Sequence, residues 1–357
     1  MRRAWFGLVA AVLAVGCGAR HYKEGATSVA VGHATVAFPL AWDGEVRTGS
    51  EPLVQAQREL EELRKRVNSQ PSAAPAAPRG PVTWPDLGTP GVASPDGAAD
   101  GALIVALENY VFVPKVPGAT KNAADWYTYL VEGRKVPVGS VRLLRNEDAS
   151  REAILSAAGE VGKSVKPGGT AWVVFIGHGA PSQDGKEGVL VGVDAQQKAV
   201  SLYARSVRQS ELAAALGGAP TVMVIDACFS GRASGGQAIA SGLQPLIVVK
   251  KASAPTGITL LSAGKSDQLA GPLPGMGRPA FSYLVLGALR GWGDANGDGV
   301  VTAGEAVDYA SKALRVLPIG RTQTPELVGS NQTLGLAKNA REKAPDLAGI
   351  VNNPALR

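Results

Sequence analysis

Residues 221–231 read TVMVIDACFSG, an unbroken apolar run that ends in an aspartate, Cys228 and a glycine. Residues 171–179 read AWVVFIGHG, a second apolar run that is followed by one reactive residue, His178, and a glycine. Apolar runs without alternation are typical of strands that are covered on both faces, as in a parallel sheet. Ligands of such sheets bind beyond the carboxyl ends of the strands. The two stretches therefore predict an α/β fold with Cys228 and His178 at one edge of its sheet.

This residue pair has the chemistry of a nucleophile and its base. After residue 33 the chain contains no cysteine except Cys228 and no histidine except His178. A free thiol has a pKa of roughly 8.5, and a neighbouring imidazole can take its proton and later protonate a leaving amine. The alternatives are an inert buried cysteine and a histidine of the core. The matched contexts, about fifty residues apart, favour one shared site.

The motifs FIGHG (175–179) and IDACFSG (225–231) resemble those of the caspase-like cysteine peptidases, in particular the bacterial metacaspase-type group of clan CD. The similarity extends from about Ala102 to about Gly329 and includes PGA at 117–119 and LSA at 261–263. The resemblance implies that Cys228 is the nucleophile and His178 the base. The backbone amides of Gly179 and Cys228 are the expected oxyanion donors, because they can stabilise charge on an acyl oxygen.

The resemblance also implies a pocket for a basic side chain at the cleavage point. Asp226 stands where metacaspases have an acid that lines this pocket, and a carboxylate there would pair with arginine or lysine. The alternative is a strand-end aspartate that binds loop amides. The family often has a second acid in the helix after the first strand. Here Asn122 occupies that position and Asp125 follows one helical turn later, which weakens the case for strong basic specificity.

Strand and helix signals alternate from residue 101 onward, which predicts a caspase-like three-layer α/β/α sandwich around a mostly parallel sheet. We expect this domain to cover residues 101–335. The expected strands are 102–107, 141–144, 171–176, 221–226, 246–250 and 258–262; the expected helices are 122–131, one capped by Asp148, 209–216 and 281–289; a hairpin is expected at 188–193. The family is often cut after its cysteine half, so Arg232, Lys250 and Lys251 are candidate autoprocessing sites.

The first 17 residues are expected to be a targeting segment. Arg2 and Arg3 precede an apolar stretch at 4–16 that is too short to span a bilayer. The stretch ends in LAVGC at 13–17, which resembles a bacterial lipoprotein signal with Cys17 as the lipidated residue, although the leucine lies four rather than three residues before it. The alternatives are an ordinary secretory peptide and an uncleaved anchor. All three readings predict an exported protein, and the lipoprotein reading predicts a protein of the cell envelope that is attached to the membrane through lipid.

The remaining segments are short or lie in appendages. We expect residues 18–70 to hold a small hairpin within 27–47 and an exposed helix at 51–67. Prolines stud residues 71–100, which predicts an extended spacer, and 336–357 are expected to be a tail. The formal charge of +6 is scattered and does not favour nucleic acid as a partner. With Cys17 acylated, Cys228 is the one thiol left, and no internal disulfide can form.

Residues 294–305 read DANGDGVVTAGE and match the twelve-residue EF-hand calcium loop. Oxygen donors stand at every ligand position: Asp294, Asn296, Asp298, the carbonyl of Val300, Thr302 and Glu305. The alternative is that TAGE at 302–305 is a helix capping box and that the Asp/Gly residues make turns without metal. We expect Ca²⁺ to bind here in a structural role, whereas the peptidase chemistry requires no cofactor.

The leading functional prediction is an exported cysteine endopeptidase that cleaves protein or peptide substrates after arginine or lysine. One alternative is a catalytically silent caspase-like module that binds partners at the envelope. A third reading is a calcium-dependent structural lipoprotein, which leaves the two strand-end motifs unexplained.

Overall fold

The structure, a computed structural model, describes residues 23–31, 34–41, 84–91, 95–243, 257–265, 267–329 and 331–351. The chain divides into two compact units, residues 1–70 and 71–357. In the first unit, β1 (Lys23–Val31) and β2 (Ala34–Ala41) pair antiparallel, which confirms the small hairpin. Cys17, the helix at 51–67, the strand at 246–250, Lys250 and Lys251 lie outside the described residues.

The second unit is built on a six-stranded sheet in the order β12-β10-β9-β5-β3-β4. Five strands run parallel and the edge strand β12 pairs antiparallel with β10. The strands are β3 (Gly101–Ala106), β4 (Val141–Arg145), β5 (Ala171–Ile176), β9 (Thr221–Asp226), β10 (Ile258–Ser262) and β12 (Glu326–Val328). Every residue of β3, β5 and β9 is buried, as the unbroken apolar runs predicted.

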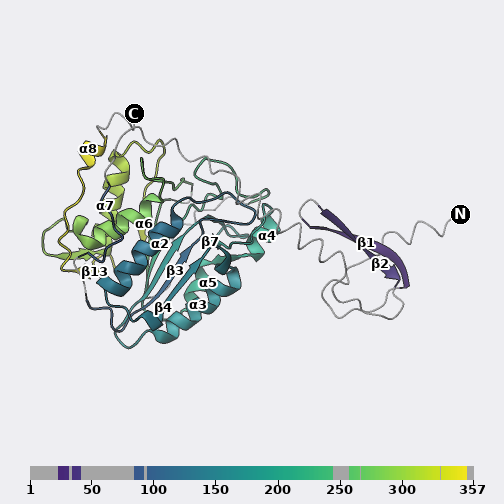
Figure 1. Ribbon diagram of the computed structural model, residues 1–357, viewed down its shortest axis with the longest axis horizontal. Coiled ribbons are helices and arrows are strands. Elements are labelled where there is room, and N and C mark those ends of the chain that lie inside the picture. Colours follow the sequence, from purple (N-terminus) through teal and green to yellow (C-terminus); the bar gives the residue numbers. More distant parts are fainter. Residues whose placement is uncertain are drawn as a thin grey trace. The chain divides into compact units, whose positions relative to one another are not determined.

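Helices cover both faces of this sheet. Figure 1 shows α2 (Ala119–Thr128), α6 (Ala280–Gly287) and α7 (Ala303–Val316) on one side, and α3 (Arg151–Ser164) and α5 (Gln209–Ala215) on the other. Alternate residues of β3 belong to two separate cores: Ile104 packs with the first helix set and Leu103 with the second. Side chains of a strand alternate between its faces, so each face buries its own core. The predicted three-layer α/β/α sandwich is confirmed.

Shorter elements connect these layers. A three-stranded sheet, β6-β7-β8, follows the end of β5. The hairpin expected at 188–193 is wrong in its bounds, because residues 188–191 form the single strand β7, which pairs antiparallel with β6 and β8. The remaining elements are the π-helices Tyr129–Gly133 and Ala288–Trp292, the 3-10 helices Val138–Ser140 and Asn146–Asp148, α4 (Ala199–Ala204), β6 (Gly179–Pro181), β7 (Gly188–Val191), β8 (Ser206–Arg208), β11 (Val300–Thr302), β13 (Gly335–Lys338) and α8 (Leu347–Val351).

The prediction that Asp148 caps the second helix is wrong, because the helix begins two residues later. Asp148 ends a 3-10 turn, and α3 begins at Arg151 with Ser150 as its N-cap. The Ser150 hydroxyl accepts a hydrogen bond from the Ala153 amide at 3.2 Å. Serine and aspartate are both favourable caps, so the sequence pattern did not distinguish them.

The expected spacer and tail are both wrong in part, because apolar side chains in them pack into the domain. Trp84 and Leu87 are buried, and the Trp84 indole donates to the Pro274 carbonyl at 3.0 Å. The spacer prediction therefore fails from residue 84 onward. In the segment predicted as a tail, Leu336 and Ile350 are buried in the same core. Within the described part of the chain, no helix combines the length and the apolar character that crossing a bilayer requires.

Candidate active site

His178 and Cys228 lie just beyond neighbouring strands that end level with each other. Ile176 of β5 pairs with Asp226 of β9, so each reactive residue follows its strand by two positions. The Gly177 amide donates to the Asp226 carbonyl at 3.2 Å, which continues the contact past the strand ends. The fold therefore brings the two sequence motifs together at one sheet edge.

The His178 imidazole is held in one orientation by the backbone. Its Nε2 lies 2.8 Å from the Pro114 carbonyl, which can only accept, so Nε2 carries the hydrogen and Nδ1 is left as a base. The His178 amide donates to the Tyr110 hydroxyl at 2.7 Å, and the two rings are 5.1 Å apart. Burial lowers the pKa of His178 to about 4, against a smaller opposing effect of the Pro114 bond. The imidazole is therefore neutral at physiological pH.

The Cys228 thiol is buried under a loop residue. Its Sγ accepts a hydrogen bond from the Ala270 amide at 2.6 Å and donates to the Ala270 carbonyl at 3.4 Å. Burial raises the pKa of Cys228 to about 11 and the charge of Asp226 adds to this, whereas the Ala270 amide and Arg321 oppose it. The resting pair is therefore a neutral thiol and a neutral imidazole, not an ion pair.

Two glycines permit the backbone path around the thiol. A Cβ on Gly179 would lie 2.8 Å from the Cys228 carbonyl, so only glycine allows these two segments to pack this closely. Gly231 adopts a φ of 69°, in the left-handed region that favours glycine. Gly179, one of the two expected oxyanion donors, thus packs directly against the other, Cys228.

Asp226 points away from solvent and into the start of α6. Its Oδ2 accepts from both the amide and the hydroxyl of Ser282, each at 2.7 Å. Burial raises the pKa of Asp226 to about 6, although the Ser282 bonds and the charge of Arg321 act in the opposite direction. The carboxylate is ionised at neutral pH and its contacts are to the protein itself.

Asp125 and Asn122, on neighbouring turns of α2, both contact a single arginine. The Arg278 Nε donates to Asn122 Oδ1 at 2.6 Å, and its Nη2 pairs with the Asp125 carboxylate. Lys121 binds the same carboxylate at 2.5 Å. Asn122 also donates to the Ser282 hydroxyl at 2.8 Å, which joins this group to Asp226. The two predicted pocket acids thus belong to one buried polar network.

Several residues of this site carried no usable sequence signal. Pro114 acts through its carbonyl and Ala270 through its backbone, and a backbone contact leaves no mark on residue identity. Tyr110 and Ser282 belong to no recognisable motif, so nothing in the sequence marks them as contacts of His178 and Asp226. Arg278 stands out because it is a basic residue in a glycine- and proline-rich stretch, PLPGMGRPAF at 272–281, and this was the one signal that sequence reasoning missed.

The predicted calcium loop spans the gap between two helical segments, as expected for its motif. Its carboxylates bind their own backbone: Asp294 accepts from the amides of Gly297 and Gly299, each at 2.9 Å, and Asp298 from Val300 at 2.7 Å. Glu305 and Thr302 form the capping box of α7. Across the described residues, no group of three or more His, Cys, Asp or Glu side chains is arranged to hold a metal ion. Asn296, Thr302 and the Val300 carbonyl are further oxygen donors in the loop.

Comparisons with known proteins place the chain in a family. No curated protein sequence matches the chain. Two solved structures are similar to the chain. A structural-genomics protein from Geobacter sulfurreducens has 18% sequence identity and a TM-score of 0.45, and the match covers 68% of this chain and 99% of that protein. Caspase-1 from Spodoptera frugiperda has 14% sequence identity and a TM-score of 0.44, and the match covers 75% of this chain and 98% of that protein. The family model described as Caspase domain matches residues 100–317, more than half of the chain. The chain therefore belongs to the caspase-domain peptidase family.

Proposed function

We propose that the chain is an exported cysteine endopeptidase that uses Cys228 and His178 to hydrolyse peptide bonds after arginine or lysine. The observation that carries the proposal is the placement of both residues, each two positions beyond level ends of adjacent strands in a caspase domain. The orientation of His178 adds support, because the Pro114 carbonyl occupies Nε2 and leaves Nδ1 to act as the base.

The chemistry follows from these neutral resting states. As the thiol attacks the carbonyl carbon, its proton passes to Nδ1 of His178 and the C–S bond forms. The acyl oxygen gains negative charge, which the amides of Gly179 and Cys228 would stabilise. The C–N bond then breaks, and the imidazolium returns the proton to the leaving amine. Water, deprotonated by the same imidazole, cleaves the thioester and restores the thiol.

Basic specificity is supported by the two acids near the nucleophile. Asp226 lies two residues before Cys228, and hydrogen bonds through Ser282 and Asn122 lead from it to Arg278, which binds Asp125. A guanidinium or ammonium group would be attracted to this group of carboxylates, and an acidic side chain would be repelled. Arginine is the better fit for the paired acceptors of Asn122 and Asp125, since its nitrogens form a rigid fork.

The test is hydrolysis of short fluorogenic peptides that differ only in having Arg, Lys or Asp before the cleaved bond. We expect the wild type to cleave the Arg and Lys peptides, Cys228→Ala to cleave none, and Asp226→Asn to lose the basic preference. Asp308→Asn, on the exposed face of α7, is the matched control for a lost carboxylate. Cleavage of the Arg peptide by Asp226→Asn at the wild-type rate would refute the specificity. A wild type without any activity would favour the silent binding module.

Export and membrane attachment form a separate part of the proposal. We infer that residues 1–16 are removed during export and that Cys17 becomes a lipidated N-terminus at the cell envelope. The basic-apolar-cysteine pattern of the sequence supports this. Mass spectrometry of the mature protein should find an N-terminal Cys17 with added acyl mass. A mature chain that begins at any other residue would refute the lipid anchor.

The calcium proposal rests on the sequence of residues 294–305 and on their backbone. Asp294 and Asp298 hold the loop in tight turns through amide bonds, and these bonds use only some of their lone pairs. Asp294, Asn296, Asp298, Val300, Thr302 and Glu305 would supply the oxygens. We propose a structural role for the ion, because the loop connects two helical segments of the core.

A further inference from the structure

The segment Leu269–Pro279, which we name the strap, covers the nucleophile. The backbone of Ala270 makes two hydrogen bonds with the Cys228 sulfur: its amide donates to Sγ, and its carbonyl accepts from the thiol. The thiol hydrogen is therefore directed at Ala270 and not at His178. A carbonyl carbon cannot reach the sulfur while Ala270 occupies this position.

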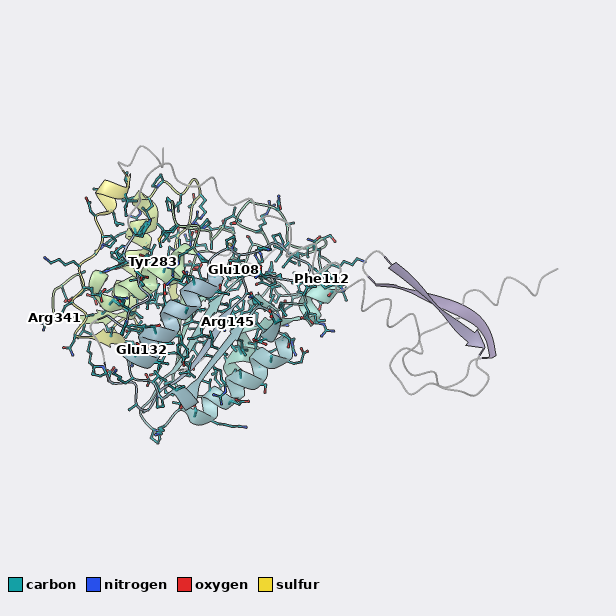
Figure 2. All side chains as sticks on the ribbon, viewed as in Figure 1. Glu108, Phe112, Glu132, Arg145, Tyr283 and Arg341 are labelled. Carbon is teal, nitrogen blue, oxygen red and sulfur yellow. The ribbon has the colours of Figure 1, made fainter. Side chains whose placement is uncertain are left out.

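The other end of the strap fills the pocket proposed for the substrate. Arg278 is only 8% exposed, and its guanidinium contacts Asn122 Oδ1 and the Asp125 carboxylate. Its Cζ lies 5.2 Å from the centre of the Tyr283 ring, a residue of α6 that is labelled in Figure 2. These are the groups that would receive an arginine side chain of a substrate. Arg278 thus makes, from within the chain, the contacts that we assign to the ligand.

The strap contacts the domain along its length and also pairs with itself. Leu273 donates to the Arg278 carbonyl at 2.8 Å, and Pro272 pairs with Pro279, so the strap folds back on itself. Arg321 binds the Pro272 carbonyl at 3.1 Å, and Trp84 binds that of Pro274 at 3.0 Å. Within the strap only Leu273, Arg278 and Pro279 are buried. The strap belongs to no helix or sheet strand, and its Ala270 and Met276 are only half-buried against the core. Irregular segments with fewer fully buried side chains than the core open at lower free energy, so the strap can leave the site while the sheet stays folded.

We propose that the strap is an autoinhibitory element and that Arg278 is its pseudosubstrate side chain, which must leave before a basic substrate can bind. This inference rests on the proposed function, since it takes the pocket of Asn122 and Asp125 as the substrate pocket. A substrate then competes with Arg278, and its apparent affinity is reduced by the fraction of molecules in which the strap is closed.

The experiment measures access to the sulfur separately from turnover. Full-length wild type, Arg278→Met and Arg315→Met are treated with iodoacetamide, and alkylation of Cys228 is followed by peptide mass spectrometry. Methionine keeps an apolar stem but has no charge, and Arg315, exposed on α7, is the matched control. We expect Arg278→Met to be alkylated about tenfold faster than the other two, equivalent to ~1.4 kcal/mol in the closing equilibrium. Equal rates in all three proteins would overturn the proposal.

A second variant guards against misfolding. Arg278→Met leaves Asp125 without its buried partner, so Arg278→Met with Asp125→Asn removes both charges and preserves packing. This double variant should also be alkylated about tenfold faster than wild type, and a rate equal to wild type would overturn the strap. In the peptidase assay, Arg278→Met should lower KM for the Arg peptide and the double variant should not. If no protein cleaves peptide but alkylation still accelerates, the proposed function and the pseudosubstrate role of Arg278 fail, whereas the shielding of Cys228 by the strap stands.

Discussion

The buried acids of the candidate active site and the acids of the loop at 294–305 differ in the partners that stabilise their negative charge. Asp125 and Asp226 are 1% and 4% exposed and bind an arginine side chain and a helix start. Asp298 is exposed and binds nearby backbone amides. A buried carboxylate needs a partner at all times, whereas an exposed one can exchange its partner for water or a cation. The first region therefore releases a partner only with a conformational change, whereas the second can exchange its partners without one.

Turnover should separate the two regions most strongly. Cys228→Ala is expected to lower kcat by about 10⁴-fold or more, because the covalent step loses its nucleophile. Asp298→Asn should leave kcat within about twofold, since a surface substitution away from the site has little effect. Peptide hydrolysis at saturating substrate measures both. Residual cleavage by Cys228→Ala above a tenth of wild type would mean that another residue performs the attack.

Stability should show the same contrast with a smaller effect. Asp125→Asn leaves Arg278 buried without its counter-charge, which should cost about 3 kcal/mol of unfolding free energy. Asp298→Asn should change it by less than about 0.5 kcal/mol. Urea unfolding monitored by tryptophan fluorescence provides the comparison. Similar losses in the two variants would show that burial does not distinguish these acids.

The pH dependence of stability should identify Asp226 as a buried acid. Its pKa in the folded state is about 6, above the ordinary 3.8, so folding favours the protonated form. The stability that this group contributes is complete below about pH 4 and is lost as the pH rises through 6. The wild type should therefore lose about 2 kcal/mol relative to Asp226→Asn between pH 4 and 7. A constant difference between the two unfolding curves would contradict the raised pKa.

The calcium loop should give the smallest effect on the apoprotein. Glu305→Gln keeps the capping box of α7, because glutamine serves in that motif, but removes the bidentate carboxylate. We expect the heat of calcium binding in calorimetry to vanish while stability without calcium changes by less than about 0.5 kcal/mol. Asp308→Asn, exposed on the same helix, should bind calcium as the wild type does. A wild type that shows no heat at millimolar calcium would reject the site.

The sequence predicted most of the fold because burial on both faces of the sheet requires unbroken apolar strands, and β3, β5 and β9 have them. The positions of His178 and Cys228 followed from the same strands. The partners of these residues did not, because Pro114 and Ala270 act through backbone atoms that every residue shares. Trp84 and Leu87 were missed for a different reason: the prolines around them indicated a spacer, and two apolar side chains in a proline-rich stretch are a weak signal.

The level pairing of β5 with β9 makes the candidate active site sensitive to strand alignment. Ile176 faces Asp226 in register, and successive side chains of a strand point to opposite faces. A slip of one residue between these strands would turn the Cys228 segment over and carry its sulfur to the far side of the sheet. Any variant that still cleaves peptide has therefore assembled its central strands in the native alignment, so activity can report on correct folding in refolding and mutant screens.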